Sequence, residues 1–266
     1  MTVAGKVSGL LTVWAGLLGW GLAADQLPCA GAALALAAVA GLIANSGVEA
    51  ALVRRRAFVG QYLVRGRLLY RLLSGRVLIL IRQGARGLVL GLLLLVTALA
   101  LEPMQWALLL ADVLLFAGLL AGMARLLSVQ VHAHAAGPLA RNWAVRLNAL
   151  LLWLAWVALM AHTPQENYSG LRWEEVLALS AGQPSVACDA IAVLARLAAV
   201  GSALALWSAQ HLFAGLRDAG ELLVAWALFL VAFGASFLLA LAYGRCLAGV
   251  LSRPWALGAM PSGEAP

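Results

Sequence analysis

The residues most able to do chemistry are two opposite charges that lie inside apolar runs. Asp112 lies in the run Leu108–Leu115, and Arg196 lies in the run Val193–Ala198. A charge within a membrane span is costly and is by default a candidate for an ion path, a proton relay or a gate. A buried ion pair can also serve only to fix the register of two helices. Both interpretations stay open.

The depths of these two charges predict that they pair. Asp112 lies nine residues after Pro103, and Arg196 lies seven residues after Asp189. If both segments are helices that start at the outer face, a rise of about 1.5 Å per residue places both charges about 10–14 Å below it. We therefore predict an intramembrane charge pair between Asp112 and Arg196.

The other reactive side chains form no recognisable constellation. His132 and His134 could both bind a metal, but a metal site needs three or four ligands and no further ligand is near them. Ser236 has no histidine after it that could act as its base. We expect no enzyme activity, no metal and no cofactor.

The cysteines form no CxxC motif, so neither a metal site nor a thiol redox site is indicated. Cys29 and Cys188 both fall near the predicted outer face. A disulfide between them is one interpretation, but unpaired thiols shielded by lipid are the favoured one.

The composition shows which solvent surrounds these residues. The chain has 266 residues, of which 64% are hydrophobic and 11% are charged. The mean hydropathy is +0.95. A soluble domain is about half apolar and about a quarter charged, and disorder needs low hydrophobicity. The chain is therefore predicted to be a multi-pass membrane protein.

The apolar stretches predict an all-α polytopic transmembrane bundle of about seven spans, each close to the length that crosses a bilayer core of about 30 Å. A transmembrane hairpin covers 1–48. A helix bundle with an outer loop at 163–189 covers 87–250, and a flexible tail covers 251–266. Six spans are the alternative if the sixth segment is re-entrant. The stretches are about 8–24, 28–45, 87–101, 104–124, 147–162, 187–212 and 221–244.

A basic segment, 49–86, separates the hairpin from the bundle. It contains nine arginines interleaved with apolar residues, and no acidic residue lies between Glu49 and Glu102. This pattern predicts an amphipathic cytoplasmic helical segment that contacts an anionic inner leaflet or a protein partner. No nucleic acid partner is expected. The candidate contacts are Arg54, Arg55, Arg56, Arg65, Arg67, Arg71 and Arg76.

The charges also indicate an orientation. The net charge is +7, and basic residues collect in cytoplasmic loops of membrane proteins. The N-terminus and the basic segment are therefore expected inside. Seven spans would place the tail outside, and six would place it inside. Abundant Arg, Ala and Leu are typical of bacterial proteins encoded at high GC content, which favours a bacterial inner membrane.

Two classes of function fit these features. The first is a subunit of a membrane channel or transport assembly that uses Asp112 and Arg196. The second is a non-catalytic anchoring or scaffolding subunit of a larger inner-membrane complex, of secretion or defence type. The scarcity of polar residues within the spans argues against a wide pore in one subunit and favours a homo- or hetero-oligomer.

Overall fold

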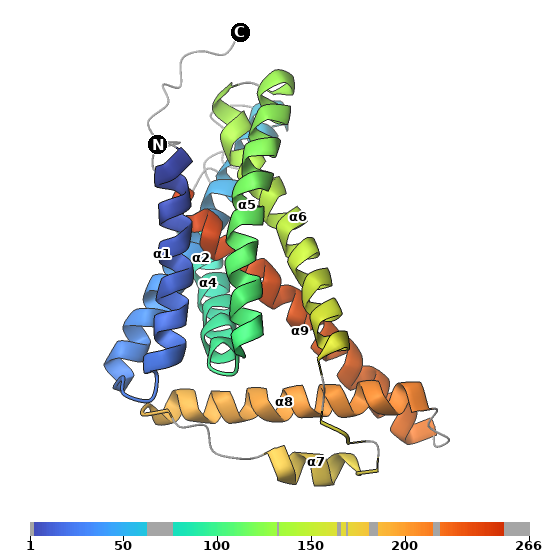
Figure 1. Cartoon of the computed structure of the whole chain (residues 1–266). Coiled ribbons are helices and arrows are strands. Elements are labelled where there is room, and N and C mark those ends of the chain that lie inside the picture. The colour runs from blue at the N-terminus through green and yellow to red at the C-terminus, as the bar shows by residue number, and fades with distance from the viewer. Residues whose placement is uncertain are drawn as a thin grey trace.

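The chain is all α-helical in the computed structural model, which confirms the predicted fold class (Figure 1). The structure describes residues 3–62, 77–131, 133–163, 166–168, 170–180, 186–214 and 219–252. Eight helices lie in these ranges. They are α1 (Val3–Ala23), α2 (Cys29–Tyr62), α4 (Val77–Ala98), α5 (Pro103–Gln130), α6 (Ala133–His162), α7 (Trp173–Ser180), α8 (Asp189–Ala214) and α9 (Ala219–Leu251).

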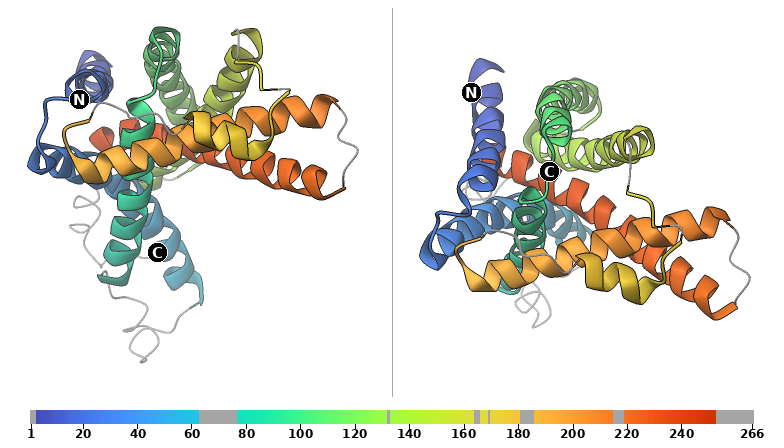
Figure 2. Two further views of the ribbon diagram at one scale, coloured as in Figure 1. Left: turned by 90° about the horizontal axis from the view of Figure 1, so that it is seen from below. Right: turned by 60° about the horizontal axis from the view of Figure 1, so that its bottom comes forward.

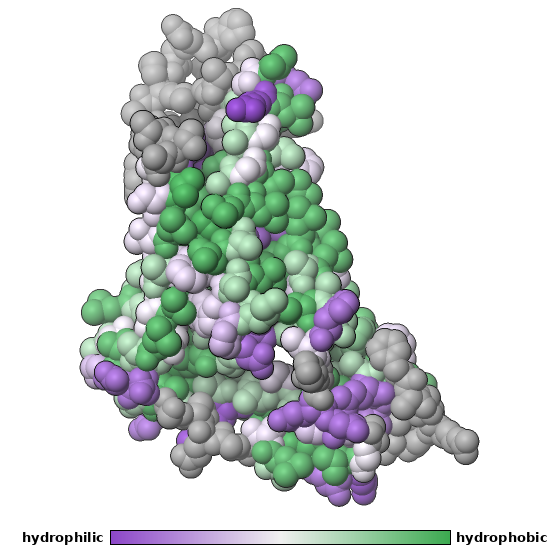
Figure 3. Space-filling view, viewed as in Figure 1, coloured by the Kyte–Doolittle hydropathy of each residue, from purple (hydrophilic) through white to green (hydrophobic). Residues whose placement is uncertain are grey.

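Seven of these helices, all except α7, are long and apolar enough to cross a membrane. Hydrophobic residues dominate the visible side of the bundle, and hydrophilic residues gather toward its two ends (Figure 3). A surface of this kind suits a protein that meets lipid around its middle and water at its ends. The multi-pass membrane prediction is therefore confirmed.

The basic segment does not form a separate surface helix over its described residues. Residues 49–62 continue α2, and residues 77–86 begin α4. No proline lies between Pro28 and the end of α2 at Tyr62, and Ala, Leu and Arg are strong helix formers. The helix therefore continues beyond the apolar run.

Six helices run between the two ends of the bundle, α9 obliquely, whereas α8 lies across one end (Figures 1 and 2). The N-terminus and the end of α9 lie at the opposite end. We call that end the basic end, because it carries the arginines of α2, α4, α6 and α9. The other end, with α8, is called the acidic end. Its acidic residues are Asp25, Glu102, Glu166, Glu174, Glu175 and Asp189.

A disulfide between Cys29 and Cys188 fastens the start of α8 to the start of α2. The backbone N–H of Ala187 also donates a hydrogen bond to the carbonyl of Ala24 at 3.4 Å. The expectation of unpaired thiols was wrong. These cysteines meet because α8 begins beside the turn between α1 and α2.

The outer loop contains a helix, α7, that the sequence analysis did not predict. Val176 of α7 is fully buried against Trp207 of α8 and Ala225 of α9. The indole N–H of Trp207 donates a hydrogen bond to the carbonyl of Leu171 at 2.8 Å. The loop is therefore packed onto α8 and the first part of α9 at the acidic end.

Small residues let α2 pack closely against α4 and α9 at the centre of the bundle. A Cβ atom placed on Gly87 of α4 would lie within 3.0 Å of the carbonyl of Ala40, and one on Gly249 of α9 would meet that of Leu42 equally closely. Close backbone approach of this kind is how helices associate in lipid. The second span therefore forms a close helix interface with α4 and α9.

Candidate functional site

Asp112 of α5 lies in the interior of the bundle, with 3% of its surface exposed. Its Oδ2 accepts a hydrogen bond from the Nδ2 of Asn148 on α6 at 2.9 Å, and Asn148 is fully buried. Helices α5 and α6 are antiparallel neighbours joined by the short connection 131–132. This hairpin brings the two side chains to the same level.

Two acceptor atoms of this pair have no hydrogen-bond donor among the described residues. They are the Oδ1 of Asp112 and the Oδ1 of Asn148, and both are buried. A buried acceptor without a donor costs about 1–3 kcal/mol, so native proteins contain few. A proton on the carboxyl, a water molecule or a small cation could each satisfy these oxygens. The pair is therefore suited to take up a small polar species.

Arg196 does not pair with Asp112. The ion pairs among the described residues are Arg141 with Glu49 and Arg172 with Glu174. The predicted pairing assumed that α8 runs parallel to α5, but α8 lies across the acidic end and keeps Arg196 there. The Nε of Arg196 is buried and has no hydrogen-bond partner.

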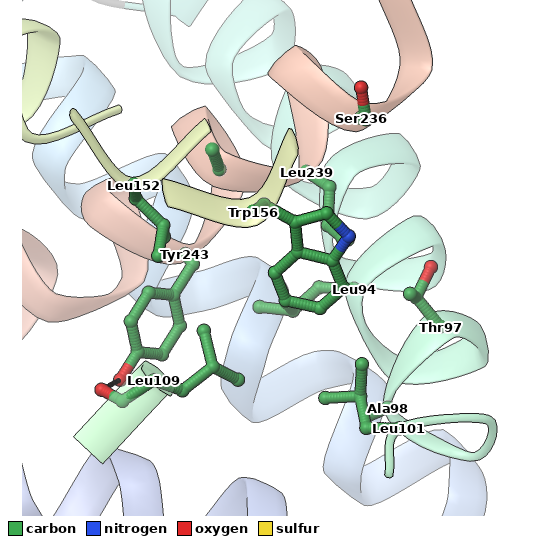
Figure 4. Close-up of a pocket in the computed structure, with 11 residues that line it drawn as sticks. Leu94, Thr97, Ala98, Leu101, Leu109, Leu152, Trp156, Ser236, Leu239 and Tyr243 are labelled. Carbon is green, nitrogen blue, oxygen red and sulfur yellow. Dashed lines mark hydrogen bonds between the residues drawn. The ribbon is translucent and has the colours of Figure 1, made fainter. Parts of the chain in front are cut away.

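An apolar pocket lies next to the Asp112 site, between α4, α5, α6 and α9 (Figure 4). Trp156 lies amid the other side chains of this pocket, and Tyr243 closes one side of it. The hydroxyl of Tyr243 donates a hydrogen bond to the carbonyl of Leu109 at 3.0 Å, one turn before Asp112. Tyr243 thus lines the pocket and reaches the α5 backbone close to Asp112. The pocket, the tyrosine and the carboxylate are therefore consecutive neighbours.

A buried ion pair links α2 to α6 at the basic end. Glu49 has 3% of its surface exposed. The Nε of Arg141 lies 2.8 Å from Oε2 of Glu49, and its Nη2 lies 2.5 Å from Oε1. This two-bond geometry is the strong form of an arginine–carboxylate contact. The negative charge of Glu49 is therefore engaged by Arg141.

The ion pair forms part of the wall of a second pocket, which Ser46, Asn142 and Arg245 also line. Arg245 is half-buried. The positive charges of Arg86, Arg54 and Arg146 act on it from α4, α2 and α6. No ion pair to any of these four arginines occurs among the described residues. Helices far apart in the sequence thus build a concentrated positive site.

The predicted lipid-contact arginines are only partly in the described chain. Arg54 and Arg55 lie on α2 at the basic end, and Arg56 lies on the same helix. Arg65, Arg67, Arg71 and Arg76 lie outside the described residues.

The sequence analysis did not single out Asn148, Tyr243, Arg141 or Arg245. A signal existed for Asn148, because an amide within an apolar run needs a partner in lipid. Glu49 also carried a signal as the acidic residue that opens the basic segment. The roles of Tyr243 and Arg245 depend on how α9 crosses the bundle, and no local pattern carries that information.

Comparison with known proteins adds no further assignment. No family model, no curated protein and no solved structure matches the chain. Its function is therefore argued from the geometry of the two sites.

Proposed function

We propose that the chain is a subunit of a membrane transport assembly that passes protons or small cations by way of Asp112. The observation that carries this proposal is a carboxylate buried in the bundle. Among the described residues it has one hydrogen bond, from a neutral amide, and no cationic partner within ion-pair distance. Carboxylates are rare in membrane spans and mark ion and proton pathways.

The neighbours of Asp112 support a narrow path rather than a wide pore. On one side the Tyr243 hydroxyl and the apolar pocket adjoin the carboxylate. On the other side Asn148 offers an amide whose Oδ1 is still open to a donor or a cation. Protons or small cations, which can pass one at a time from one oxygen atom to the next, suit this arrangement. A second subunit could complete the path, in line with the expected homo- or hetero-oligomer.

Flux through proteoliposomes tests the transport proposal. We expect Asp112→Asn to abolish proton or sodium flux into vesicles that contain the purified protein, because the amide removes the exchangeable charge and keeps the shape. Flux is read from a pH-sensitive or sodium-sensitive dye under an imposed gradient.

Asp25→Asn is the matched control, because it makes the same chemical change at an exposed residue of the acidic end. It should leave the flux unchanged. Flux at the wild-type rate in a well-folded Asp112→Asn protein would contradict the proposal.

An anchoring or scaffolding role in a larger complex is the second candidate. It is supported by the first half of α9, where large apolar side chains including Trp226, Leu230 and Phe233 are exposed. Absence of flux for every tested ion, together with one reproducible co-purifying membrane protein, would favour this role. Neither candidate requires an enzyme active site.

We propose a bacterial inner membrane, with the basic end in the cytoplasm and in contact with anionic lipid. The distribution of charge supports this orientation through the positive-inside rule. The disulfide at the acidic end supports it as well, because disulfides persist in oxidising compartments such as the periplasm. The same orientation makes six crossings, with α8 lying along the outer interface.

A further inference from the structure

We infer that the basic end binds a phosphate group at Arg245, between α2, α6 and α9. The phosphate could belong to the headgroup of an anionic phospholipid or be free phosphate. This inference does not rest on transport through Asp112, because it concerns a different pocket with different residues.

Arg245 is the first reason for the inference. Its guanidinium is half-buried on α9, and it makes no hydrogen bond or ion pair with the described residues. A guanidinium carries five N–H donors and never loses its charge. Its planar fork matches two oxygens of one phosphate group. An anion is therefore the natural partner for this side chain.

The arginines around it are the second reason. Arg86, Arg54 and Arg146 repel Arg245 from three other helices. Glu49 could have offset this positive charge, but both of its carboxylate oxygens are bound by Arg141. When a fold holds like charges close together, a multivalent anion that binds among them lowers their mutual repulsion.

The pocket provides the remaining contacts. Ser46 of α2 and Asn142 of α6 line it and can donate hydrogen bonds. The Nδ2 of Asn45 donates to the carbonyl of Gly249 at 2.9 Å and thereby joins α2 to α9 beside the pocket. The walls of the site are therefore fixed by contacts that do not involve the ligand.

The position of the pocket favours a lipid as the source of the phosphate. It lies where α2, α6 and α9 reach the basic end, at the level where headgroups of one leaflet would meet the bundle. Basic pockets between transmembrane helices on the cytoplasmic side are recognised sites for anionic headgroups. Free phosphate offers the same group without acyl chains, so the two sources can be separated.

Thermal unfolding of the full-length protein in detergent tests the site. We add dioctanoyl phosphatidylglycerol in one series, inorganic phosphate in a second and dioctanoyl phosphatidylcholine in a third. We expect phosphatidylglycerol to raise the unfolding temperature with saturation, and phosphatidylcholine to raise it much less. A saturating rise with inorganic phosphate alone would identify free phosphate as the source.

Variants show whether the rise depends on the pocket. Arg245→Gln should weaken the apparent affinity about tenfold, the effect expected when a charge-assisted hydrogen bond is lost. Arg125→Gln is the matched control, because Arg125 is an exposed arginine of α5 near the same end. It should leave the affinity unchanged. If Arg245→Gln does not fold, the exposed Arg146→Gln should still weaken binding.

Two results would overturn the inference. One is that neither phosphatidylglycerol nor inorganic phosphate raises the unfolding temperature. The other is a rise that Arg125→Gln reduces as much as the pocket variants do, since that would indicate a diffuse effect of positive charge.

Discussion

The carboxylate of Asp112 and the amide of Asn148 depend on each other. Asn148 provides a hydrogen bond to Asp112, and both residues are buried where no other donor reaches their free oxygens. Replacing one member with an apolar residue therefore leaves the other buried without its hydrogen-bond partner. Replacing both leaves an apolar contact between α5 and α6. Residues coupled in this way show effects on stability that do not add.

A double-mutant cycle should reveal this dependence. Asn148→Leu is expected to lower the free energy of unfolding by about 1–3 kcal/mol, since the carboxylate loses its donor. Asp112→Leu combined with Asn148→Leu should be closer to wild type than Asn148→Leu alone. Chemical unfolding in detergent measures both. If the loss in the double variant equals the sum of the losses in Asn148→Leu and Asp112→Leu, the two residues are not coupled.

At this scale the sequence revealed Asp112 but not its partner. A carboxylate in an apolar run is visible from the residue types alone. Its partner depends on which helix lies beside α5, and the depth argument assumed a parallel α8. Similarly, Trp20 and Trp207 are almost fully buried, and their indole N–H groups donate to backbone carbonyls of segments distant in the sequence.

Helix α2 is the central element of the bundle. It packs against α4 and α9 through positions where one partner has no side chain, and it is tied to α6 by Glu49. Small residues are needed there because the backbones approach too closely for a Cβ atom. The stability of the bundle should therefore depend on single glycines of the neighbouring helices.

Gly249→Ala tests this dependence at the contact with Leu42. The added methyl group would overlap a backbone carbonyl, and we expect a loss of about 1–3 kcal/mol in the free energy of unfolding. Gly118→Ala is the matched control, because a Cβ atom at Gly118 meets nothing within 4 Å. The control should be neutral or slightly stabilising, since alanine favours helix over glycine. A fully stable Gly249→Ala protein would show that the helices can move apart at little cost.

The seven apolar helices were predictable from length and hydropathy, but the direction of α8 was not. A helix that lies across one end of a bundle can have the same length and composition as the helices that run between its ends, as α8 demonstrates. Its direction is fixed by contacts distant in sequence, namely the disulfide with Cys29 and the packing with α7 and α9. The small helix α7 was missed because a helix of eight residues gives only a weak periodic signal.

For the whole molecule, the direction of α8 determines where the chain ends lie. With α8 across the acidic end, α9 returns to the basic end, so the start of α1 and the end of α9 lie at the same end of the bundle. The positive charges of α9 then join those of α2, α4 and α6. If α9 ran in the opposite direction, Arg245 would lie away from the arginines of α2, α4 and α6.

Reporter fusions test this arrangement. A fluorescent protein that folds only in the cytoplasm should be bright when it is fused after Pro266. Alkaline phosphatase fused at the same position should be inactive. A cysteine introduced in place of Glu166 should react with a membrane-impermeant maleimide from outside. An active phosphatase after Pro266 would show that α8 crosses the membrane.

The disulfide between Cys29 and Cys188 closes a covalent ring across a sequence separation of 159. The ring includes α2, α4, α5, α6 and α7, so most of the bundle belongs to a closed loop rather than a linear chain. One cut by a protease in the exposed segment around Arg172 would open the ring without separating the pieces. After such a cut the molecule would remain one covalent body until a reductant broke the disulfide.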